Sequence, residues 1–393
     1  MKKNILFIMN NLNCGGAEKA LVSLLQTIDY NKYNVDLLLF KKEGIFLNNI
    51  PQDVNLLKEP FGYSYFDMSI KKAILGCIKK FRFDIAINRL LAGFIFKTEK
   101  SRVICEQKVW KYISRGIKSL NKKYDVAIGY LEKNPIYYCV EKVNADKKIG
   151  FIHNDYEKLG MNPDIDGIYF NQLDNIITVS EGCADVLKQT FPQHKSKIQV
   201  MYNIISPKVI NKMASEDIST DKEKINIVSV GRLNYQKGFD IAIEACKQLK
   251  KDGYDFVWNI LGEGEERGKL EKMIKEYHLE DVFILSGIKE NPYPYIKQAD
   301  IYVQPSRFEG KSIAIDEAKI LNKPILVTNF STAKDQINDQ INGLIVDMNP
   351  ESIYNGIKQL IGSDELRRRL SQNLSNEELG TEKEIEKLYK MFD

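Results

Sequence analysis

The sequence predicts a tandem α/β protein, in which two doubly wound parallel sheets follow one another along the chain. Three observations support this prediction. Short apolar runs alternate with amphipathic stretches, which is typical of parallel strands joined by helices. This alternation stops in a polar stretch at 205–224 and then resumes. A length of 393 residues also suffices for two domains that each bury a core.

The first half of the chain begins with an apolar run at 4–9, which predicts a buried strand. A glycine turn and a helix follow it. The helix carries apolar residues at helical spacing that should form one buried face: Ala20, Leu21, Leu24, Leu25 and Ile28. Later strands are predicted at 35–40, 125–130, 148–152, 175–179 and 199–202.

The second half repeats this alternation more clearly. We place an N-terminal domain at 1–205 and a C-terminal domain at 206–377. Strands are predicted at 225–230, 256–261, 282–286, 301–304, 324–327 and 344–346, with helices between them such as 239–250 and 265–277. Ligands of such sheets bind beyond the carboxyl ends of the strands, so the polar residues at strand ends are the functional candidates.

The composition excludes several other classes of protein. With 44% hydrophobic and 28% charged residues, the chain is neither disordered, collagen-like nor a coiled coil. No apolar run approaches the roughly 18 residues of a membrane span. The first apolar run, at 5–9, is too short for the core of a signal peptide. Six scattered cysteines and three histidines favour neither disulfides nor a metal site, so we expect a cytoplasmic protein without a metal.

The net charge of +4 is the sum of two unlike halves. Residues 1–200 hold 30 basic and 21 acidic side chains, or +9, and the remainder holds 27 and 32, or −5. Much of the excess lies at 69–123, which has 15 Lys or Arg and three acidic residues. Such a segment suggests an anionic partner, either a membrane surface or a nucleic acid. A solvated helical face is the alternative interpretation.

Two turns after predicted strands have the residues to meet an anion. Gly15 and Gly16 let the backbone approach a ligand, and the helix after them offers unpaired amides. This turn matches neither GxGxxG nor a P-loop, so a simple tight connection is the alternative. After the strand at 225–230, Arg232 and Lys237 place two cations at the ligand edge, where they suit a diphosphate. Surface cations on a loop are the alternative there.

A pair of carboxylates follows the strand at 301–304. Glu317 comes eight residues after Glu309, a little over two helical turns, so both can point into one cleft. We expect a helix to begin near Gly310. Its first turn would present to an anion the amides of Lys311, Ser312 and Ile313.

The strand at 148–152 runs directly into His153, one of three histidines in the chain. Asn154 and Asp155 continue the polar segment at what should be the ligand edge of the first sheet. A histidine at a strand end is also a common structural residue, which is the alternative interpretation here.

Five motifs occur together in one order along the chain. They are GGAE at 15–18, His153 at a strand end, VGRLNYQKG at 230–238, LGEG at 261–264 and EGKSIAIDE at 309–317. The set resembles the retaining glycosyltransferases of family 4. The segment at 291–310 is similar to enzymes that assemble bacterial capsule, exopolysaccharide or lipopolysaccharide. The resemblance implies a GT-B fold, in which two Rossmann-like domains face across a cleft and a C-terminal helix at 378–393 crosses back to the first domain.

The resemblance also implies roles for the matching residues. Arg232 and Lys237 would bind the diphosphate of the donor. Glu309 would hold the hydroxyls of the donor sugar, Glu317 would bind the ribose, and His153 would lie beside the sugar. Further donor-binding positions are Gly15, Gly16, Gly231, Gly262, Gly310, Lys311, Ser312 and Ile313.

Two positions bear on specificity and on proton transfer. Lys311 stands where relatives commonly carry an apolar residue, which leaves the donor sugar open. Asp155 is the candidate for the acceptor site. Retention in this family is usually explained by attack from the front face, in which the acceptor hydroxyl gives its proton to the departing phosphate and no protein base is required.

The function implied by the resemblance is a retaining, metal-independent transfer of a hexosyl or N-acetylhexosaminyl unit. The donor would be a UDP-sugar and the acceptor a lipid-linked saccharide in cell-surface polysaccharide synthesis. The C-terminal domain would bind the donor and the N-terminal domain the acceptor. A UDP-sugar epimerase of GT-B fold and a catalytically silent sugar-nucleotide-binding assembly partner are the alternatives.

The basic segment then becomes an expected docking face on the inner side of the cell membrane. Aromatic and apolar residues among its cations would be interfacial anchors. The expected docking residues are Lys108, Trp110, Lys111, Arg115 and Lys118, with Tyr112 and Ile113 beside them. A nucleic-acid partner is not expected, because the segment lacks interleaved aromatics on a recognisable binding fold.

Overall fold

The computed structural model describes residues 2–13, 15–218 and 224–392, so Cys14 and part of the expected linker lie outside the described residues. The chain divides into two compact units. Unit 1 comprises Met1–Asn13, Ala17–Tyr202 and Glu384–Asp393, and unit 2 comprises Cys14–Gly16 and Asn203–Lys383. Three differences from the predicted domains follow. The division falls three residues before the predicted 205/206 boundary, Gly15 and Gly16 group with unit 2, and the last segment joins unit 1 from Glu384 rather than from 378.

Unit 1 is built on a seven-stranded parallel sheet with the order β3-β2-β1-β4-β5-β6-β7. The strands are β1 Lys3–Met9, β2 Tyr33–Leu39, β3 Val54–Leu56, β4 Lys123–Gly129, β5 Asn144–Ile152, β6 Asn175–Thr178 and β7 Ile198–Val200. The strand β3 was not predicted, because three residues with one buried side chain are too short to show a pattern. The order reverses between β1 and β4, which makes their carboxyl ends the switch point of the sheet.

Most helices of unit 1 lie between these strands in the sequence, and the last one, α17, follows unit 2 at the end of the described chain. They are α1 Gly16–Thr27, α2 Ser64–Asp67, α3 Ile70–Lys79, α4 Phe83–Thr98, α5 Arg102–Gly116, α6 Asn134–Lys142, α7 Tyr156–Leu159, α8 Pro163–Phe170, α9 Glu181–Thr190 and α17 Ile385–Phe392, with short 3-10 turns at Leu47–Asn49 and Pro192–His194. The predicted face of α1 is buried, and Ile28 is buried just after the helix ends. None of the helices in the described ranges is both long and apolar enough to cross a membrane.

Unit 2 has a six-stranded parallel sheet with the order β10-β9-β8-β11-β12-β13. Its strands are β8 Ile225–Val230, β9 Phe256–Leu261, β10 Phe283–Leu285, β11 Ile301–Gln304, β12 Ile325–Thr328 and β13 Leu344–Val346. Its helices are α10 Pro207–Met213, α11 Phe239–Lys251, α12 Arg267–Glu276, α13 Tyr293–Gln298, α14 Ile313–Ile320, α15 Pro350–Ile361 and α16 Asp364–Ser375, with 3-10 turns η3 Tyr235–Lys237, η4 Ala333–Asp335 and η5 Glu382–Glu384. All six predicted strands are present, and the sheet reverses its order between β8 and β11.

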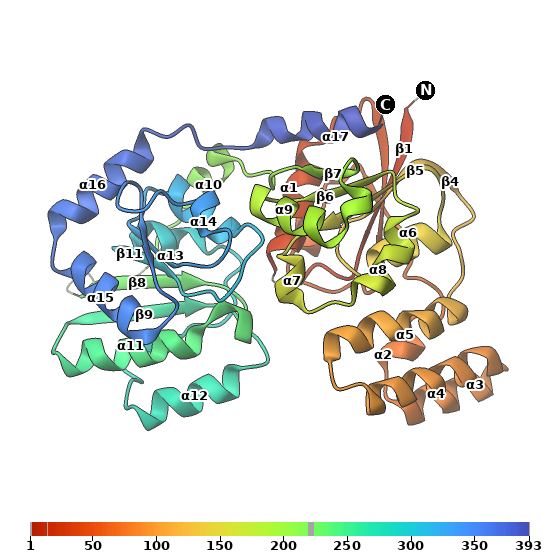
Figure 1. The fold of residues 1–393 in the computed structure, drawn as a ribbon, viewed down its shortest axis with the longest axis horizontal. Helices are drawn as coiled ribbons and strands as arrows, with labels where there is room; N and C mark the ends of the chain where they lie inside the picture. Colours follow the sequence, from red (N-terminus) through yellow and green to blue (C-terminus); the bar gives the residue numbers. More distant parts are fainter. Residues whose placement is uncertain (1, 14, 219–223, 393) are drawn as a thin grey trace. The chain divides into compact units, whose positions relative to one another are not determined.

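The last helix, α17, packs on unit 1, which confirms the predicted return of the chain (Figure 1). The Tyr389 ring stacks on Tyr33 with centroids 5.0 Å apart, and Phe392 meets the same ring edge-on. The Tyr389 hydroxyl accepts a hydrogen bond from the Asp29 amide at 2.8 Å, and Leu388 is fully buried. A residue 360 positions away in sequence thus completes the core around β2.

Four helices, α2 to α5, occupy the chain between β3 and β4 (Figure 1, orange). A small core of their own holds α2, α3 and α4 together, and it is made by Tyr65, Ala73, Cys77, Ile85 and Ala86. The buried guanidinium of Arg89 donates to the Tyr65 carbonyl at 3.0 Å and to the Met68 carbonyl at 2.9 Å, so α4 is tied to the segment around α2.

Candidate functional site

Glycines frame the carboxyl ends of β8 and β9 in unit 2. A Cβ on Gly262 would lie 1.9 Å from the Gly231 carbonyl oxygen, and one on Gly264 would lie 2.2 Å from the Leu233 carbonyl oxygen. The Gly262 amide also donates to the Gly287 carbonyl at 2.9 Å. The loops after β8, β9 and β10 therefore touch through their backbones, and the glycines of the LGEG and VGR motifs are what permit this contact.

Gly238 brings the loop after β8 onto the loop after β11. Its φ of 66° is in the left-handed region, and a Cβ there would lie 2.1 Å from the Pro305 carbonyl oxygen. The stem of Lys237 passes over Gly231, within 3.0 Å of where a Cβ would stand. This path carries the Lys237 ammonium across the switch point of the sheet to the residues after β11.

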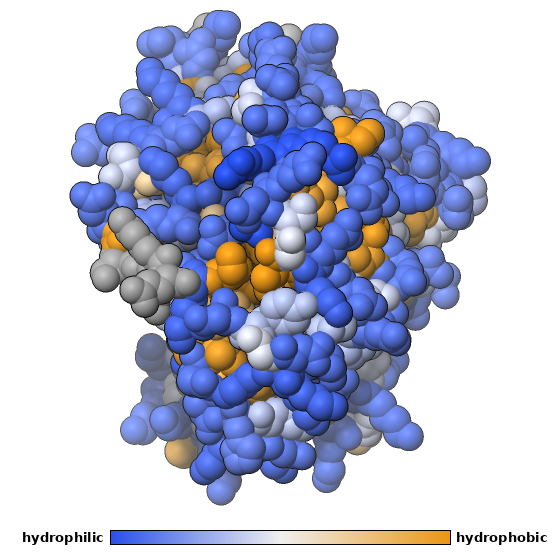
Figure 2. Space-filling view, turned by 90° about the vertical axis from the view of Figure 1, so that its left-hand side faces the viewer, coloured by the Kyte–Doolittle hydropathy of each residue, from blue (hydrophilic) through white to orange (hydrophobic). Residues whose placement is uncertain are grey.

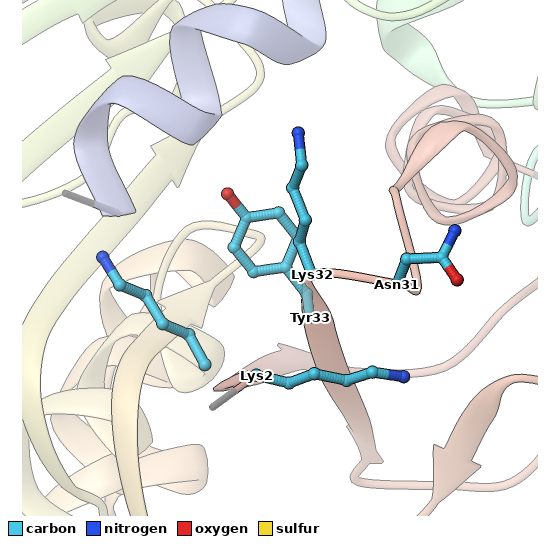
Figure 3. A pocket seen from close by; sticks show the side chains of 5 residues that line it. Lys2, Asn31, Lys32 and Tyr33 are labelled. Carbon is cyan, nitrogen blue, oxygen red and sulfur yellow. The ribbon is translucent and has the colours of Figure 1, made fainter.

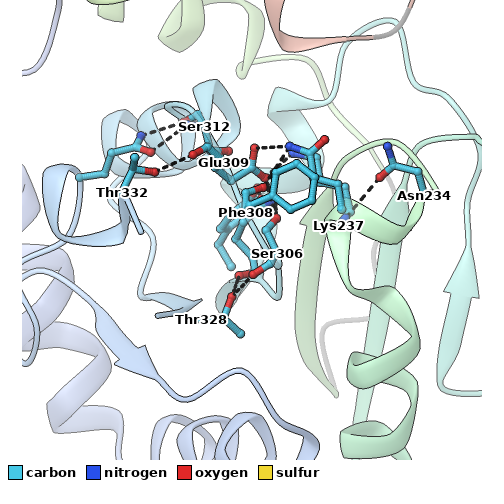
Figure 4. A network of polar contacts seen from close by, with 12 residues as sticks. Asn234, Lys237, Ser306, Phe308, Glu309, Ser312, Thr328 and Thr332 are labelled. Carbon is cyan, nitrogen blue, oxygen red and sulfur yellow. Dashed lines mark hydrogen bonds and ion pairs between the residues drawn. The ribbon is translucent and has the colours of Figure 1, made fainter. Parts of the chain in front are cut away.

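Glu309 lies at the centre of the resulting network (Figure 4). Its Oε1 accepts from Lys237 Nζ at 2.6 Å, from Ser306 Oγ at 2.6 Å and from Gln304 Nε2 at 3.2 Å. Its Oε2 receives only a long hydrogen bond of 3.4 Å, from Gln236 Nε2, among the described residues. One carboxylate oxygen is thus saturated and the other still has capacity to accept.

The Lys237–Glu309 pair is nearly buried, with side chains 16% and 6% exposed. A buried ion pair is tolerated when further hydrogen bonds satisfy both groups, and here Ser306 and Gln304 supply them to the carboxylate. Lys237 Nζ uses one of its three N–H groups on Glu309, which leaves two directed elsewhere. The pair can therefore bind a neutral hydroxyl on one side and an anion on the other.

A second layer of hydrogen bonds holds this network in place. The Tyr302 hydroxyl donates to Gln304 Oε1 at 2.6 Å, and Gln304 Nε2 donates to Ser306 Oγ at 2.8 Å. The Thr332 hydroxyl donates to the Glu309 carbonyl at 2.9 Å and thereby fixes the backbone of the site. Sequence reasoning missed these three residues and Ser306. Gln304 and Ser306 alternate on the end of β11 with the spacing of one strand face, which was an available signal.

The second carboxylate, Glu317, is buried on α14 and accepts from the Tyr293 hydroxyl at 3.1 Å. Burial raises the pKa of Tyr302 well above its usual range, and the charges of Glu317 and Glu309 add to this effect. Tyr302 therefore lies within the field of both carboxylates, although each has its own hydrogen-bond partners.

The helix α14 begins at Ile313, three residues later than the predicted start near Gly310. The reason is a tertiary contact: the Ser312 amide donates to Gln336 Oε1, and Gln336 Nε2 donates back to the Ser312 carbonyl, both at 2.8 Å. To bind a phosphate, the Ser312 amide would have to exchange this partner.

Lys311 is directed toward Asp316, with Nζ 3.8 Å from Oδ2 and a side chain 11% exposed. Burial raises the pKa of Asp316, and the charge of Lys311 partly offsets that effect. The sequence left open whether this ammonium meets solvent or the donor; in the structure it lies next to Asp316 of α14, the helix that follows it.

In unit 1, His153 ends β5 between aromatic rings. Its centroid lies 4.8 Å from that of Tyr130 and 5.8 Å from that of Phe151. Burial lowers the pKa of His153 to about 4, while a hydrogen bond with the Tyr130 backbone acts the other way. Its Nε2 is buried without a hydrogen-bond partner among the described residues. His153 is therefore a neutral imidazole with one polar atom still to be satisfied.

Glu132, which the sequence analysis did not single out, binds the backbone of His153. Its Oε1 accepts from the amides of His153 at 2.5 Å and Asn154 at 3.1 Å. Burial raises the pKa of Glu132, and these amides counteract part of that effect. The carboxylate follows β4, so it joins the ends of the two neighbouring strands β4 and β5.

Asp155 is a helix cap, which corrects its expected place in the acceptor site. Its Oδ1 accepts from the amides of Glu157 at 3.1 Å and Lys158 at 3.3 Å, at the start of α7. The residue is 2% exposed. A buried carboxylate engaged by the helix amides has a structural role, and we remove it from the candidate site.

The remaining predicted donor residues lie in two other turns. Gly16 is the first residue of α1, and a Cβ there would meet nothing within 4 Å, so no close approach requires a glycine in this structure. Arg232 follows β8 with an exposed side chain. A hollow lined by Lys2, Lys3, Asn31, Lys32 and Tyr33 lies at the amino ends of β1 and β2, the edge opposite the candidate residues (Figure 3).

The expected membrane anchors on α5 are contradicted. Trp110 is fully buried, packs against Phe40, Tyr137 and Tyr138, and donates Nε1–H to Glu141 at 3.2 Å. Ile113 is also buried. The helix turns its apolar stripe to the core of unit 1, as an amphipathic helix does, and leaves only cations outside. Among the expected docking cations, Lys108 is paired with Glu99 at 2.6 Å, while Lys111 and Arg115 on the helix and Lys118 after its end are exposed.

Comparison with known proteins gives a family for one part of the chain. Residues 212–377 match the family described as Glycosyl transferases group 1. The N-acetylgalactosamine-N,N'-diacetylbacillosaminyl-diphospho-undecaprenol 4-alpha-N-acetylgalactosaminyltransferase of Campylobacter jejuni is 32% identical over 56% of this chain and 59% of that protein. The amylovoran biosynthesis glycosyltransferase AmsD of Erwinia amylovora is 29% identical over 40% of this chain and 44% of that protein. The chain thus spans less than two thirds of the length of these relatives.

Solved structures match over the whole chain. Staphylococcus aureus TarM, crystallised with UDP, superposes with a TM-score of 0.69 and 16% identity over 100% of both chains. Anabaena HepE in complex with UDP superposes with a TM-score of 0.65 and 15% identity over 99% of both chains. Identities this low show the fold alone. Residues 212–377 therefore match the Glycosyl transferases group 1 family, and the chain has the GT-B fold.

Proposed function

We propose that the chain is a retaining glycosyltransferase that moves a hexosyl or N-acetylhexosaminyl unit from a UDP-sugar to a lipid-linked saccharide. The observation that carries this proposal is the Lys237–Glu309 pair at the switch point of unit 2. Glu309 Oε2 can accept from sugar hydroxyls, and the remaining N–H groups of Lys237 can donate to a diphosphate. A sugar nucleotide presents both kinds of group, one next to the other.

The matched proteins support the choice of donor and acceptor. The C. jejuni relative is by name a transferase for a saccharide on diphospho-undecaprenol, and TarM and HepE were both crystallised with UDP. We carry these properties to this chain as part of the proposal, together with a place at the inner face of the cell membrane in polysaccharide synthesis.

In the proposed step, the bond between C1 of the donor sugar and the β-phosphate oxygen breaks. The acceptor oxygen bonds to C1 on the same face, and its proton passes to the departing phosphate oxygen, so no protein base is required. Lys237 and Arg232 offset the charge that develops on the diphosphate, while Glu309 holds the sugar hydroxyls. His153 offers a neutral hydrogen-bonding atom, which adds no charge beside the reacting carbon.

The test is a panel of UDP-sugars with undecaprenyl-diphosphate saccharides as acceptors, with UDP release and product linkage as readouts. We expect acceptor-dependent release with one donor and a product that keeps the donor's anomeric configuration. Glu309→Gln should abolish most of the release, whereas Lys272→Ala, an exposed lysine of α12, should not. The proposal fails if none of the donors gives UDP release with the wild type. It also fails if Glu309→Gln is as active as the wild type.

The same panel separates the alternatives. An epimerase would change the donor sugar without an acceptor, and a silent partner would bind UDP-sugar without releasing UDP. We also propose that the reaction needs no metal, so release should be unchanged after EDTA treatment. A loss of release that Mg²⁺ or Mn²⁺ restores would contradict that part of the proposal.

A further inference from the structure

The α3–α4 hairpin of unit 1 exposes an unusual number of large apolar side chains. Of the sixteen exposed large apolar residues among the described residues, eleven lie between Phe61 and Phe96. Seven of them are more than half exposed on α3, on α4 or at the turn between them: Leu75, Phe81, Phe83, Ile87, Leu90, Phe94 and Phe96. Phe81, at the turn, is 81% exposed. By contrast, the face of the molecule seen in Figure 2 shows hydrophilic side chains around small apolar groups.

Four exposed apolar side chains form a stripe on α4. Ile87, Leu90, Leu91 and Phe94 are spaced three and four residues apart, so they share one face of the helix. The opposite face, with Ile85, Ala86, Arg89 and Ala92, is already buried. A helix that is apolar on two faces needs two apolar environments, and the part of the chain that the structure describes provides only one of them.

The hairpin is held rigidly by its buried face, so the exposed stripe is a built surface. The small core around Tyr65 and Cys77 fixes α3 against α4, and Arg89 fixes α4 to the segment around α2. The Ile70 side chain of α3 packs onto the α4 backbone at Gly93, since a Cβ there would lie 2.8 Å from Ile70 Cδ1. These contacts hold α3 and α4 in their present arrangement, in which the stripe is exposed. We therefore treat the hairpin as one rigid body with an uncovered apolar face.

Lysines surround this apolar face. Residues 70–100 hold eight basic and two acidic side chains, a net charge of +6. Both acidic groups are engaged: Asp84 pairs with Arg82 at 2.7 Å and Glu99 with Lys108 at 2.6 Å. The exposed lysines of the same segment are Lys71, Lys72, Lys79, Lys80, Lys97 and Lys100.

We propose that the α3–α4 hairpin docks this chain on an anionic lipid bilayer, with the Phe81 turn and the α4 stripe entering the interface. The choice among occupants rests on charge. A second copy would bring +6 against +6, whereas an anionic bilayer offers both negative headgroups for the lysines and an apolar layer for the stripe. In this proposal the membrane contact is made by the hairpin and not by the predicted anchors on α5, because Trp110 is buried. The proposal deepens the proposed function, since a lipid-linked acceptor is reached at a membrane.

The test is co-flotation of the full-length protein with phosphatidylcholine vesicles that contain 30% phosphatidylglycerol, in the absence of any sugar donor. We expect binding at least tenfold stronger than to pure phosphatidylcholine, and weaker at high salt. Phe81→Ser/Phe94→Ser should reduce binding at least tenfold, and Lys72→Glu/Lys79→Glu should remove the preference for anionic lipid. The matched control is Val209→Ser/Ile341→Ser, two exposed apolar residues of unit 2, which should bind as the wild type does.

Each outcome decides the proposal. It is overturned if the wild type does not float, if the hairpin variants float equally well, or if light scattering shows a dimer that Phe81→Ser/Phe94→Ser separates. Circular dichroism shows whether the variants remain folded, and the lysine variant tests the same surface without touching its apolar side chains. Transfer to a water-soluble acceptor should be equal in wild type and hairpin variants. Flotation without any transfer would retain the docking surface and reject the proposed function.

Discussion

The carboxyl edges of the two sheets differ in whether their central polar residue is surrounded by charged or by uncharged groups. In unit 2, a buried lysine and two uncharged donors surround the Glu309 carboxylate. In unit 1, aromatic rings and the backbone surround His153, and its Nε2 has no partner among the described residues. The first environment suits a charged ligand group such as a diphosphate, and the second suits an uncharged group such as a sugar ring.

The largest expected effect tests the charged edge. Lys237→Ala should lower kcat/KM for the donor about 10²–10³-fold, because it removes a donor aimed at the leaving group. It should also destabilise unit 2 by about 3 kcal/mol, because Glu309 is then left buried without its counter-ion. Glu309→Gln keeps the shape and should lower activity with a smaller effect on stability. UDP release and urea unfolding measure the two quantities, and equal activity of Lys237→Ala and Lys272→Ala would break the contrast.

The next effect separates the two units as folding bodies. Leu388→Ala on α17 should destabilise unit 1 by about 2–5 kcal/mol, since its side chain is fully buried. The chain's two tryptophans serve as reporters, because Trp110 lies in unit 1 and Trp258 in unit 2, and both are fully buried. In urea, with Trp258→Phe or Trp110→Phe as the background, the Trp110 transition should shift and the Trp258 transition should not. Leu360→Ala on α15 should give the reverse pattern.

A third effect tests the uncharged edge by pH. Burial lowers the pKa of His153 from 6.5 to about 4, so between these values only the unfolded state takes up the proton. Stability should therefore fall as pH decreases through this window, by up to about 3 kcal/mol. His153→Gln should flatten that slope, whereas His278→Gln, an exposed histidine, should not. The raised pKa of Glu132 acts with the opposite sign and is common to both variants. An unchanged slope in His153→Gln would contradict the assignment.

The smallest effect concerns Asp155. Loss of the cap in Asp155→Ala should cost about 1 kcal/mol, with the KM for the acceptor unchanged. A tenfold rise in that KM without any loss of stability would return Asp155 to the acceptor site. Thermal unfolding and acceptor titration, at one pH, distinguish the two results.

The parallel strands and the order of the motifs were predictable because both are local. Apolar runs end at glycine, proline or polar residues within a few positions, as at 225–230 and 301–304. Strand ends in turn place the candidate residues, which is why Lys237, Glu309 and His153 could be proposed from the sequence. The strand β3 and the late start of α14 were not predictable, since the first is too short and the second depends on Gln336, 24 residues away.

The sequence by itself determined the fold class, the positions of most strands and the polar residues that follow them, because these depend on periodicity and on where strands end. Tertiary structure decided which side chains are partners and which face of a helix is covered. Glu132 and Thr332 became part of the site through contacts with other segments, and Trp110 lies away from the surface because of the packing of α5. The exposed stripe on α4 was likewise decided by tertiary structure. A helix with two apolar faces can bury either one, and which face is buried depends on the segments that pack against it.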